Sequence, residues 1–287
     1  MPRSFNKIRI LGIEDLPLLE RLLRTSEYIY QRFTLEELPA LLKHYPTVGI
    51  FNGESLVGFL LSQTLNAPSA WIGGFGVSWT ESHVYDSLLR MLLEGLEPLL
   101  IARGIHHLHY SGSDTEQDWL RDDLLTCGFA PHRLLYAYDK FDYGVPGAGN
   151  QQVTIRPFEP GDIPALLDIE KECFEHLWRY DAVAFTDIAD THPYFVVAEL
   201  DGKVVGYQFN ALDSETGYLV RIAVHPSFGS RGIGARLMAE AIHFFEDAQV
   251  QRILLNTQDD NTYAHRLYEW FGFIRTQQVG FVLRKFL

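Results

Sequence analysis

An apolar strand end and a glycine-rich loop stand next to each other at Ile222-Ala223-Val224-His225-Pro226 and Gly229-Ser230-Arg231-Gly232-Ile233-Gly234. Apolar residues then recur at spacings of three and four as far as Phe245, which predicts an amphipathic helix after the loop. Glycines at a helix start leave backbone N–H groups pointing outward, and these groups together with the helix dipole favour an anion such as a pyrophosphate. Arg231 adds a positive charge to that predicted site.

The spacing of the glycines separates this loop from other phosphate-binding loops. It reads G-x-x-G-x-G, so it differs from the G-x-G-x-x-G of a dinucleotide fold, and it lacks the Gly-Lys-Ser/Thr ending of a P-loop. Taken alone, the loop fits a phosphate site and also a glycine turn that only permits tight packing of strand and helix.

A second motif decides between these two interpretations. It follows a predicted strand at residues 252–255 and fits the pattern N-x-x-A-x-x-L-Y-x-x-x-G-F. Its residues are Asn261, Ala264, Leu267, Tyr268, Gly272 and Phe273. In this order the two motifs resemble those of the GCN5-related N-acetyltransferase (GNAT) family. The chain departs from the family pattern at the loop start, where Gly229 replaces the usual Gln or Arg.

The resemblance implies an α/β (α+β) fold with a mixed, mostly antiparallel twisted sheet flanked by helices. It implies an acyltransferase that moves an acetyl group from acetyl-CoA to an amine by direct attack in a ternary complex. Tyr268 would act as the general acid, since a phenol is protonated at neutral pH. The residues expected to hold acetyl-CoA are Ile222, Ala223, Val224, Gly229, Ser230, Arg231, Gly232, Ile233, Gly234, Ala235 and Asn261.

The sequence also contains an internal repeat. Ile8-Arg9 and Asp15-Leu16-Pro17 recur at one offset as Ile155-Arg156 and Asp162-Ile163-Pro164. We therefore predict a tandem protein with GNAT-like residues 1–143, a linker at 144–152 and a catalytic domain at 153–287. In the second copy the strands at 217–224 and 252–258 are expected to splay and admit the pantetheine arm of CoA. Closing strands are expected at 275–279 and 281–285.

The first copy is predicted to have lost the CoA-binding loop and the catalytic tyrosine. Tyr85 and Ser87 stand where the second copy has Gly232 and Gly234, and Leu124 stands at the position of Tyr268. A tyrosine at the loop would block close approach of phosphates, and Glu81 would repel them. The glycines at 73, 74 and 76 indicate a bulged strand rather than a ligand loop.

Composition narrows the function classes. A formal net charge of −13 argues against nucleic acid as a partner. It fits a small-molecule or peptide amine as substrate, and it also fits a surface charge that serves solubility alone. Neither a membrane span nor a signal segment is evident, and two cysteines give no disulfide framework, so we expect a cytoplasmic protein. No metal site is expected, although His107 and His109 point to one side of a predicted strand. The oligomeric state stays open.

The general base is not decided by the sequence. Asn256, where related N-terminal acetyltransferases often have a Glu, cannot act as a base. The candidates are Glu170, Glu172, Glu175, His176, Asp213, Glu215 and Asp259. A CoA-binding regulatory or scaffold protein, and a tandem GNAT using another acyl donor such as charged tRNA, remain alternatives.

Overall fold

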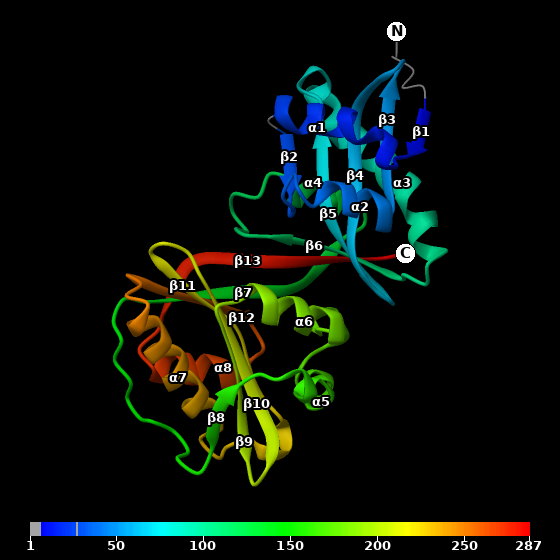
Figure 1. Ribbon diagram of the computed structural model, residues 1–287. Helices are drawn as coiled ribbons and strands as arrows, with labels where there is room; N and C mark the ends of the chain where they lie inside the picture. The colour runs from blue at the N-terminus through cyan, green and yellow to red at the C-terminus, as the bar shows by residue number, and fades with distance from the viewer. Residues whose placement is uncertain (1–6, 27) are drawn as a thin grey trace. The chain divides into compact units, whose positions relative to one another are not determined.

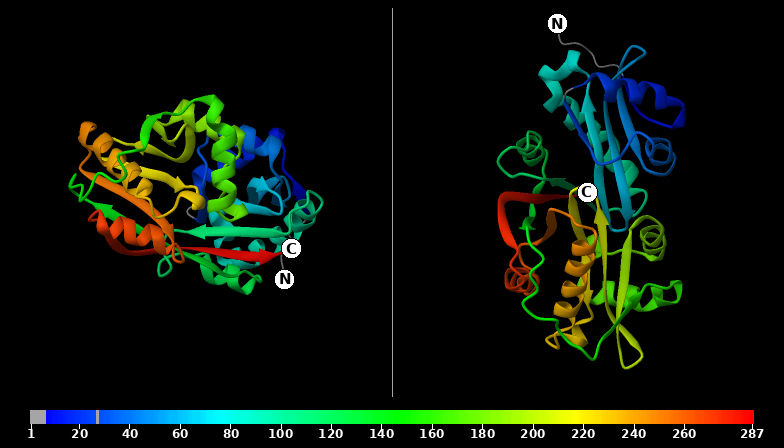
Figure 2. Two further views of the ribbon diagram at one scale, coloured as in Figure 1. Left: turned by 90° about the horizontal axis from the view of Figure 1, so that it is seen from below. Right: turned by 60° about the vertical axis from the view of Figure 1, so that its left-hand side comes forward.

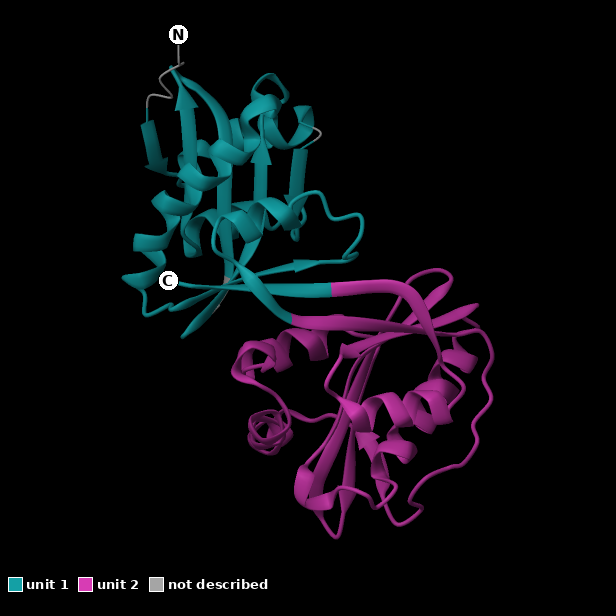
Figure 3. Cartoon of the chain, turned by 180° about the vertical axis from the view of Figure 1, so that it is seen from behind, with its two compact units in different colours: residues 1–132, 281–287 teal, residues 133–280 magenta. Residues whose placement is uncertain are grey.

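The chain, described at residues 7–26 and 28–287 by a computed structural model, forms two compact units (Figure 3). Unit 1 consists of the chain up to His132 together with Phe281–Leu287, and unit 2 of Arg133–Gly280. Each unit has a mixed, mostly antiparallel sheet flanked by helices, which confirms the predicted fold class (Figure 1). No helix of the described part has both the length and the apolarity needed to cross a membrane.

Unit 1 is built on a sheet in the order β1-β3-β4-β5-β6-β13, with β2 paired to β5. The strands are β1 (Lys7–Ile10), β2 (Tyr28–Gln31), β3 (Thr47–Asn52), β4 (Ser55–Asn66), β5 (Ser69–Val77), β6 (His107–Gly112) and the part of β13 (Ile274–Phe286) from Phe281 on. The helices are α1 (Leu16–Thr25), α2 (Leu38–His44), α3 (Tyr85–Ile101) and α4 (Arg121–Thr126). Apolar residues of α1 and α2 share one core with β3 and β4, because both helices turn their leucines toward the sheet.

Unit 2 has the strand order β13-β7-β12-β11-β10-β9-β8, in which β13 contributes Ile274–Gly280. The strands are β7 (Ala130–Lys140, from Arg133 on), β8 (Thr154–Pro157), β9 (Tyr194–Leu200), β10 (Lys203–Leu212), β11 (Thr216–Val224) and β12 (Arg252–Gln258). The helices are α5 (Ile163–Cys173), α6 (Ala182–Thr191), α7 (Ile233–Asp247) and α8 (Thr262–Trp270). Helices α5 and α6 pack on one face of this sheet and α7 on the other (Figure 1 and Figure 2).

The sequence repeat appears as a repeated ion pair. Arg9 donates to Asp15 across 2.8 Å, and Asp15 accepts the backbone N–H of Gly12. Arg156 donates to Asp162 in the same way, also across 2.8 Å. In both units this carboxylate ties the first strand to the start of the first helix, which explains why the sequence keeps both residues at one spacing.

Two features differ from the sequence-based expectations. The two closing strands predicted at 275–279 and 281–285 form one strand, β13, because Gly280 keeps an extended backbone and the chain continues without a turn. The compact units also do not follow the ends of the repeat, since residues 133–143 belong to unit 2 and 281–287 to unit 1. The assignment of one degenerate and one catalytic domain stays a prediction.

Candidate active site between β11 and β12

The two central strands of unit 2 separate along their length. They run parallel and are paired at Thr216–Tyr218 with Arg252–Leu254, and no pairing continues beyond Tyr218 in the described chain. The opposite edge of β11 stays paired to β10 as far as Val224. Residues Ile222–Val224 therefore have one edge without a strand partner, where the splay was predicted.

A cavity of about 630 Å³ lies at this separation. Its lining joins the end of β11, the glycine loop, the start of α7, one face of α8 and the end of α5. The lining residues are Glu172, Cys173, Phe174, Ile222, Ala223, Val224, Pro226, Phe228, Gly229, Ser230, Gly232, Ile233, Gly234, Ala235, Asn261, Tyr263, Ala264, Leu267 and Tyr268. The structure thus brings together every predicted site residue except Arg231, which is exposed with its guanidinium 5.3 Å from the ring centre of Phe228.

The glycine loop has the backbone shape that its sequence predicts. Gly232 caps α7 in the left-handed region at φ 73°, which a residue with a side chain rarely adopts. Gly234 lies two residues further on, in the first turn of α7, and a Cβ there would lie 3.5 Å from Leu267, which is ordinary contact. The first backbone N–H groups of α7 have no partner within the helix, and the loop leaves them beside the cavity.

Sequence reasoning missed a residue that supports this loop. Asn150, in the predicted linker, donates from Nδ2 to the carbonyl oxygen of Arg231 across 2.9 Å, and its N–H donates to Gly232 across 3.1 Å. Gly149 allows the approach, since a Cβ there would lie 2.2 Å from the backbone nitrogen of Arg236. The residues from 149 to 150 are therefore docked on the glycine loop.

Tyr268 lies in the wall of the cavity with 5% of its surface exposed. Burial is the main cause that raises its pKa above the usual value, and the nearby Tyr138 ring, 5.6 Å away, acts in the same direction. The phenol is therefore protonated at neutral pH. Asn261 caps α8, accepting the N–H of Ala264 across 3.2 Å, so it has the structural role of a helix cap as well as a place in the cavity lining.

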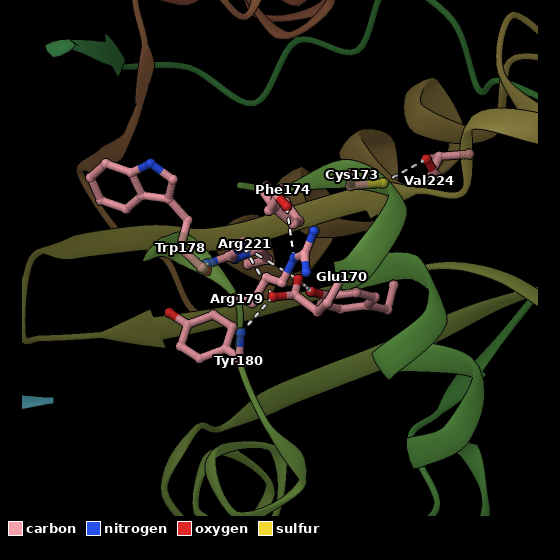
Figure 4. A network of polar contacts seen from close by, with 9 residues as sticks. Glu170, Cys173, Phe174, Trp178, Arg179, Tyr180, Arg221 and Val224 are labelled. Atoms are coloured by element: carbon pink, nitrogen blue, oxygen red, sulfur yellow. Dashed lines mark hydrogen bonds and ion pairs between the residues drawn. The ribbon is translucent and has the colours of Figure 1, made fainter. Parts of the chain in front are cut away.

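The end of α5 also lines the cavity. The Cys173 thiol donates to the carbonyl oxygen of Val224, with sulfur and oxygen 3.2 Å apart (Figure 4). Burial, and next Glu170, raise the pKa of Cys173 to about 11, so the group is a thiol rather than a nucleophilic thiolate at neutral pH.

Glu172 is the base candidate that the structure places in this lining. Glu170 is buried against Arg221, and Glu175 pairs with Arg133. Asp213 accepts backbone N–H groups of Glu215 and Thr216 in a turn. The remaining candidates are His176, Glu215 and Asp259, none of which lines the cavity.

In unit 1 the two central strands, β5 and β6, also separate, but another strand occupies the edge that this separation leaves. Strands β5 and β6 are paired at Ser69–Trp71 with His107–His109, as in unit 2. Beyond that point β2 pairs along the same edge, with Tyr28 opposite Val77 and Gln31 opposite Gly74. Gly73 is the extra residue of a bulge, as predicted.

The helix start in unit 1 is also covered. Tyr85 begins α3 where unit 2 has Gly232, its hydroxyl donates to Asp123 across 2.6 Å, and its ring stacks on Tyr28 at 5.6 Å. Leu124, at the place of Tyr268, is fully buried.

Comparison with known proteins agrees with this geometry. The model of the acetyltransferase (GNAT) family matches residues 163–273. An uncharacterised N-acetyltransferase of Methanocaldococcus jannaschii is 31% identical over 123 residues, which are 42% of this chain and 78% of that protein. A mycothiol acetyltransferase of Streptomyces griseus is 30% identical over 142 residues, or 46% of each chain, so the similarity spans less than half of that relative.

Solved structures extend the similarity in fold to both units. A GCN5-related N-acetyltransferase of Sphaerobacter thermophilus has a TM-score of 0.65 and 17% identity, covering 98% of this chain and 95% of its own. A tandem GNAT protein from the clavulanic acid biosynthesis pathway has a TM-score of 0.66 and 12% identity, covering 98% of both chains. At these identities the likeness shows the tandem fold alone. By its sequence relatives and its fold, the chain belongs to the acetyltransferase (GNAT) family.

Proposed function

We propose that unit 2 binds acetyl-CoA and transfers its acetyl group to an amine, and that unit 1 binds no CoA. One observation carries the proposal: the edge of Ile222–Val224 that has no strand partner lies in the same cavity as the glycine start of α7 and the protonated Tyr268.

The residues present fit acetyl-CoA. The free edge of β11 can take the amide groups of a pantetheine arm as an extra strand would. The backbone N–H groups from Arg231 to Ala235, at the start of α7, suit a pyrophosphate, and the absence of a side chain at Gly234 leaves space for it. Acetyl-CoA supplies an acetyl group that is already activated as a thioester.

Each catalytic task then has a residue. A backbone N–H near Val224 polarises the acetyl carbonyl. As the amine nitrogen bonds to the carbonyl carbon and the carbon–sulfur bond breaks, Tyr268 gives its proton to the departing sulfur. Glu172 takes the proton that the amine loses, directly or through water. The cavity holds the amine and the thioester next to each other, and this proximity increases the rate of the reaction.

The acceptor is proposed only as a class. A net charge of −13 and the carboxylate of Glu172 in the lining favour a positively charged or amine-bearing molecule, either a small amine or a peptide amine. The similarity to the mycothiol acetyltransferases gives no acceptor for this chain, because it covers only about half of each of those relatives, between 43% and 51%.

The test is release of CoA thiol from acetyl-CoA in the presence of a panel of amines, with the acetylated product identified by mass spectrometry. The proposal predicts thiol release that depends on an amine. Without an amine, the mass of the protein should stay unchanged, because the Cys173 thiol is a poor nucleophile. Tight binding of acetyl-CoA without turnover on any amine would instead support a CoA-binding regulatory protein.

A further inference from the structure

A buried ion pair lies behind the wall of the cavity. Glu170 of α5 is 1% exposed, and its carboxylate accepts Nη1 of Arg221 across 3.2 Å and the hydroxyl of Tyr207. The Arg221 guanidinium lies between two rings, 4.0 Å from the centre of Phe174 and 4.2 Å from that of Tyr180 (Figure 4).

This pair fixes the backbone of the segment that follows α5. Nη2 of Arg221 donates to the carbonyl oxygen of Trp178 across 2.8 Å, and the N–H of Tyr180 donates to Glu170 across 2.6 Å. Arg179 adds bonds of 2.8 Å to the carbonyl oxygens of Phe174 and Lys171. The segment 174–180 therefore folds back onto the end of α5, and Phe174 is held in the cavity wall.

The matching segment of unit 1 takes a different path. In both units the residue at the end of the first helix bonds the last residue of the central strand: Cys173 donates to Val224, and Ser26 donates to Val77. After Ser26, however, the chain runs back along the strand as β2 and occupies the edge that unit 2 leaves free.

The residue that aligns with Arg221 also differs between the units. It is Gly74, and a Cβ there would lie 2.7 Å from the ring of Phe33. Unit 1 thus has no cation at this position, and an aromatic ring takes its place. Leu23 stands where unit 2 has Glu170, so the carboxylate is missing as well.

We infer that Arg221 and Glu170 are positioning residues, which hold segment 174–180 away from the edge of β11 and keep the acetyl-CoA groove open. The inference rests on the proposed function of unit 2. Because only the open groove binds, a population with a closed edge raises the apparent Kd in inverse proportion to the fraction that stays open. The groups do not touch the reacting atoms, so their effect falls on binding first.

The experiment compares acetyl-CoA affinity, measured by calorimetry, in the wild type and three variants. Arg221→Lys keeps the charge and loses the fork and the stacking. The pair Glu170→Gln with Arg221→Met removes both charges, so that no buried charge is left alone. Arg156→Lys is the matched control, since Arg156 is also paired with carboxylates but touches neither the segment nor the cavity.

The inference predicts that Arg221→Lys and the paired variant raise the Kd about tenfold or more, the size of losing hydrogen bonds to a charged group. Arg156→Lys should bind as the wild type does. Folded Arg221 variants with wild-type affinity would overturn the inference. A wild-type protein that binds no acetyl-CoA would instead contradict the proposed function.

Hydrogen exchange in the ligand-free wild type tests the inference even if the variants fail to fold. The inference predicts that the amide of Tyr180 is protected before ligand is added, because it donates to a buried carboxylate. Exchange of this amide at the rate of an unstructured chain would overturn the inference without any variant.

Discussion

The side chain of Asn150 donates a hydrogen bond of 2.9 Å to the carbonyl oxygen of Arg231, in the loop that leads into α7. The backbone N–H of Asn150 also bonds the next carbonyl, that of Gly232. These two bonds hold the carbonyl side of the loop, so its N–H groups stay turned toward the cavity. A residue outside both motifs thus supports the predicted phosphate site.

Asn150→Ala is expected to weaken acetyl-CoA binding about three- to tenfold, because one hydrogen bond that orders the loop is lost. Calorimetry with acetyl-CoA measures the change. The control is Gln151→Ala, since Gln151 is exposed and bonds only within its own segment in the described chain. Equal affinity of both variants and the wild type would show that Asn150 does not support the site.

Tyr268→Phe is expected to lower kcat by about 10²–10⁴-fold and to leave the KM for acetyl-CoA nearly unchanged. The ring and its packing against Tyr138 are kept, so stability should hardly change. Single-turnover kinetics give the clearest measurement, because product release does not contribute.

The first unit supplies a control for Tyr268. Leu124→Ala should cost about 2–5 kcal/mol of stability and should leave acetyl transfer by the folded protein intact. Full single-turnover activity of Tyr268→Phe would make this tyrosine a packing residue only.

The pH dependence follows from the raised pKa of Tyr268. The protonated phenol is the active form, so its contribution is lost as pH rises through its pKa. Because burial moves that pKa above the usual value near 10, the single-turnover rate should not fall on account of Tyr268 between about pH 7 and pH 10. A descending limb near pH 8 that disappears in Tyr268→Phe would contradict this assignment.

Local patterns predicted most elements of unit 2, because the apolar spacing, the turns and the glycine helix start are encoded within a few residues of each other. Strands β11 and β12 run over Thr216–Val224 and Arg252–Gln258, where strands were predicted at 217–224 and 252–258. Helix α7 begins at Ile233, directly after Gly232. The glycine loop and the motif that begins at Asn261 line one cavity, because they follow β11 and β12, the two strands that separate there.

Contacts between distant residues could not be predicted in the same way. No local pattern distinguishes Asn150 from a linker residue, or Arg221 from a charged residue on a strand. The ion pair of Arg221 with Glu170 depends on the packing of α5 on β11, and sequence reasoning took Glu170 for a possible base. The end of β13 belongs to unit 1, although the strand begins in unit 2. Predicting this would require pairings between residues more than a hundred positions apart, such as Phe281 with Gly112.

The compact units predict which fragment folds. Residues 133–280 should be soluble and bind acetyl-CoA, because β7 pairs with β12 from Ile253 to Gln258 and Tyr138 is buried in the same core. Residues 153–287 lack that strand, which exposes the edge of β12 and part of the core, so this fragment should aggregate. Size-exclusion chromatography and calorimetry test both. A soluble, binding-competent 153–287 would show that the predicted domain boundaries describe the folding unit.

The stoichiometry of acetyl-CoA binding tests the central claim most directly. Calorimetry is expected to give one site per chain, and Gly234→Glu should abolish it, because a carboxylate would fill the phosphate position and repel its charge. The fold should tolerate this change, since a Cβ at Gly234 meets only ordinary contacts. Ser87→Glu, at the matching exposed position of unit 1, should bind acetyl-CoA as the wild type does. Two equivalent sites per chain, or binding lost in Ser87→Glu and retained in folded Gly234→Glu, would contradict the assignment of the site to unit 2.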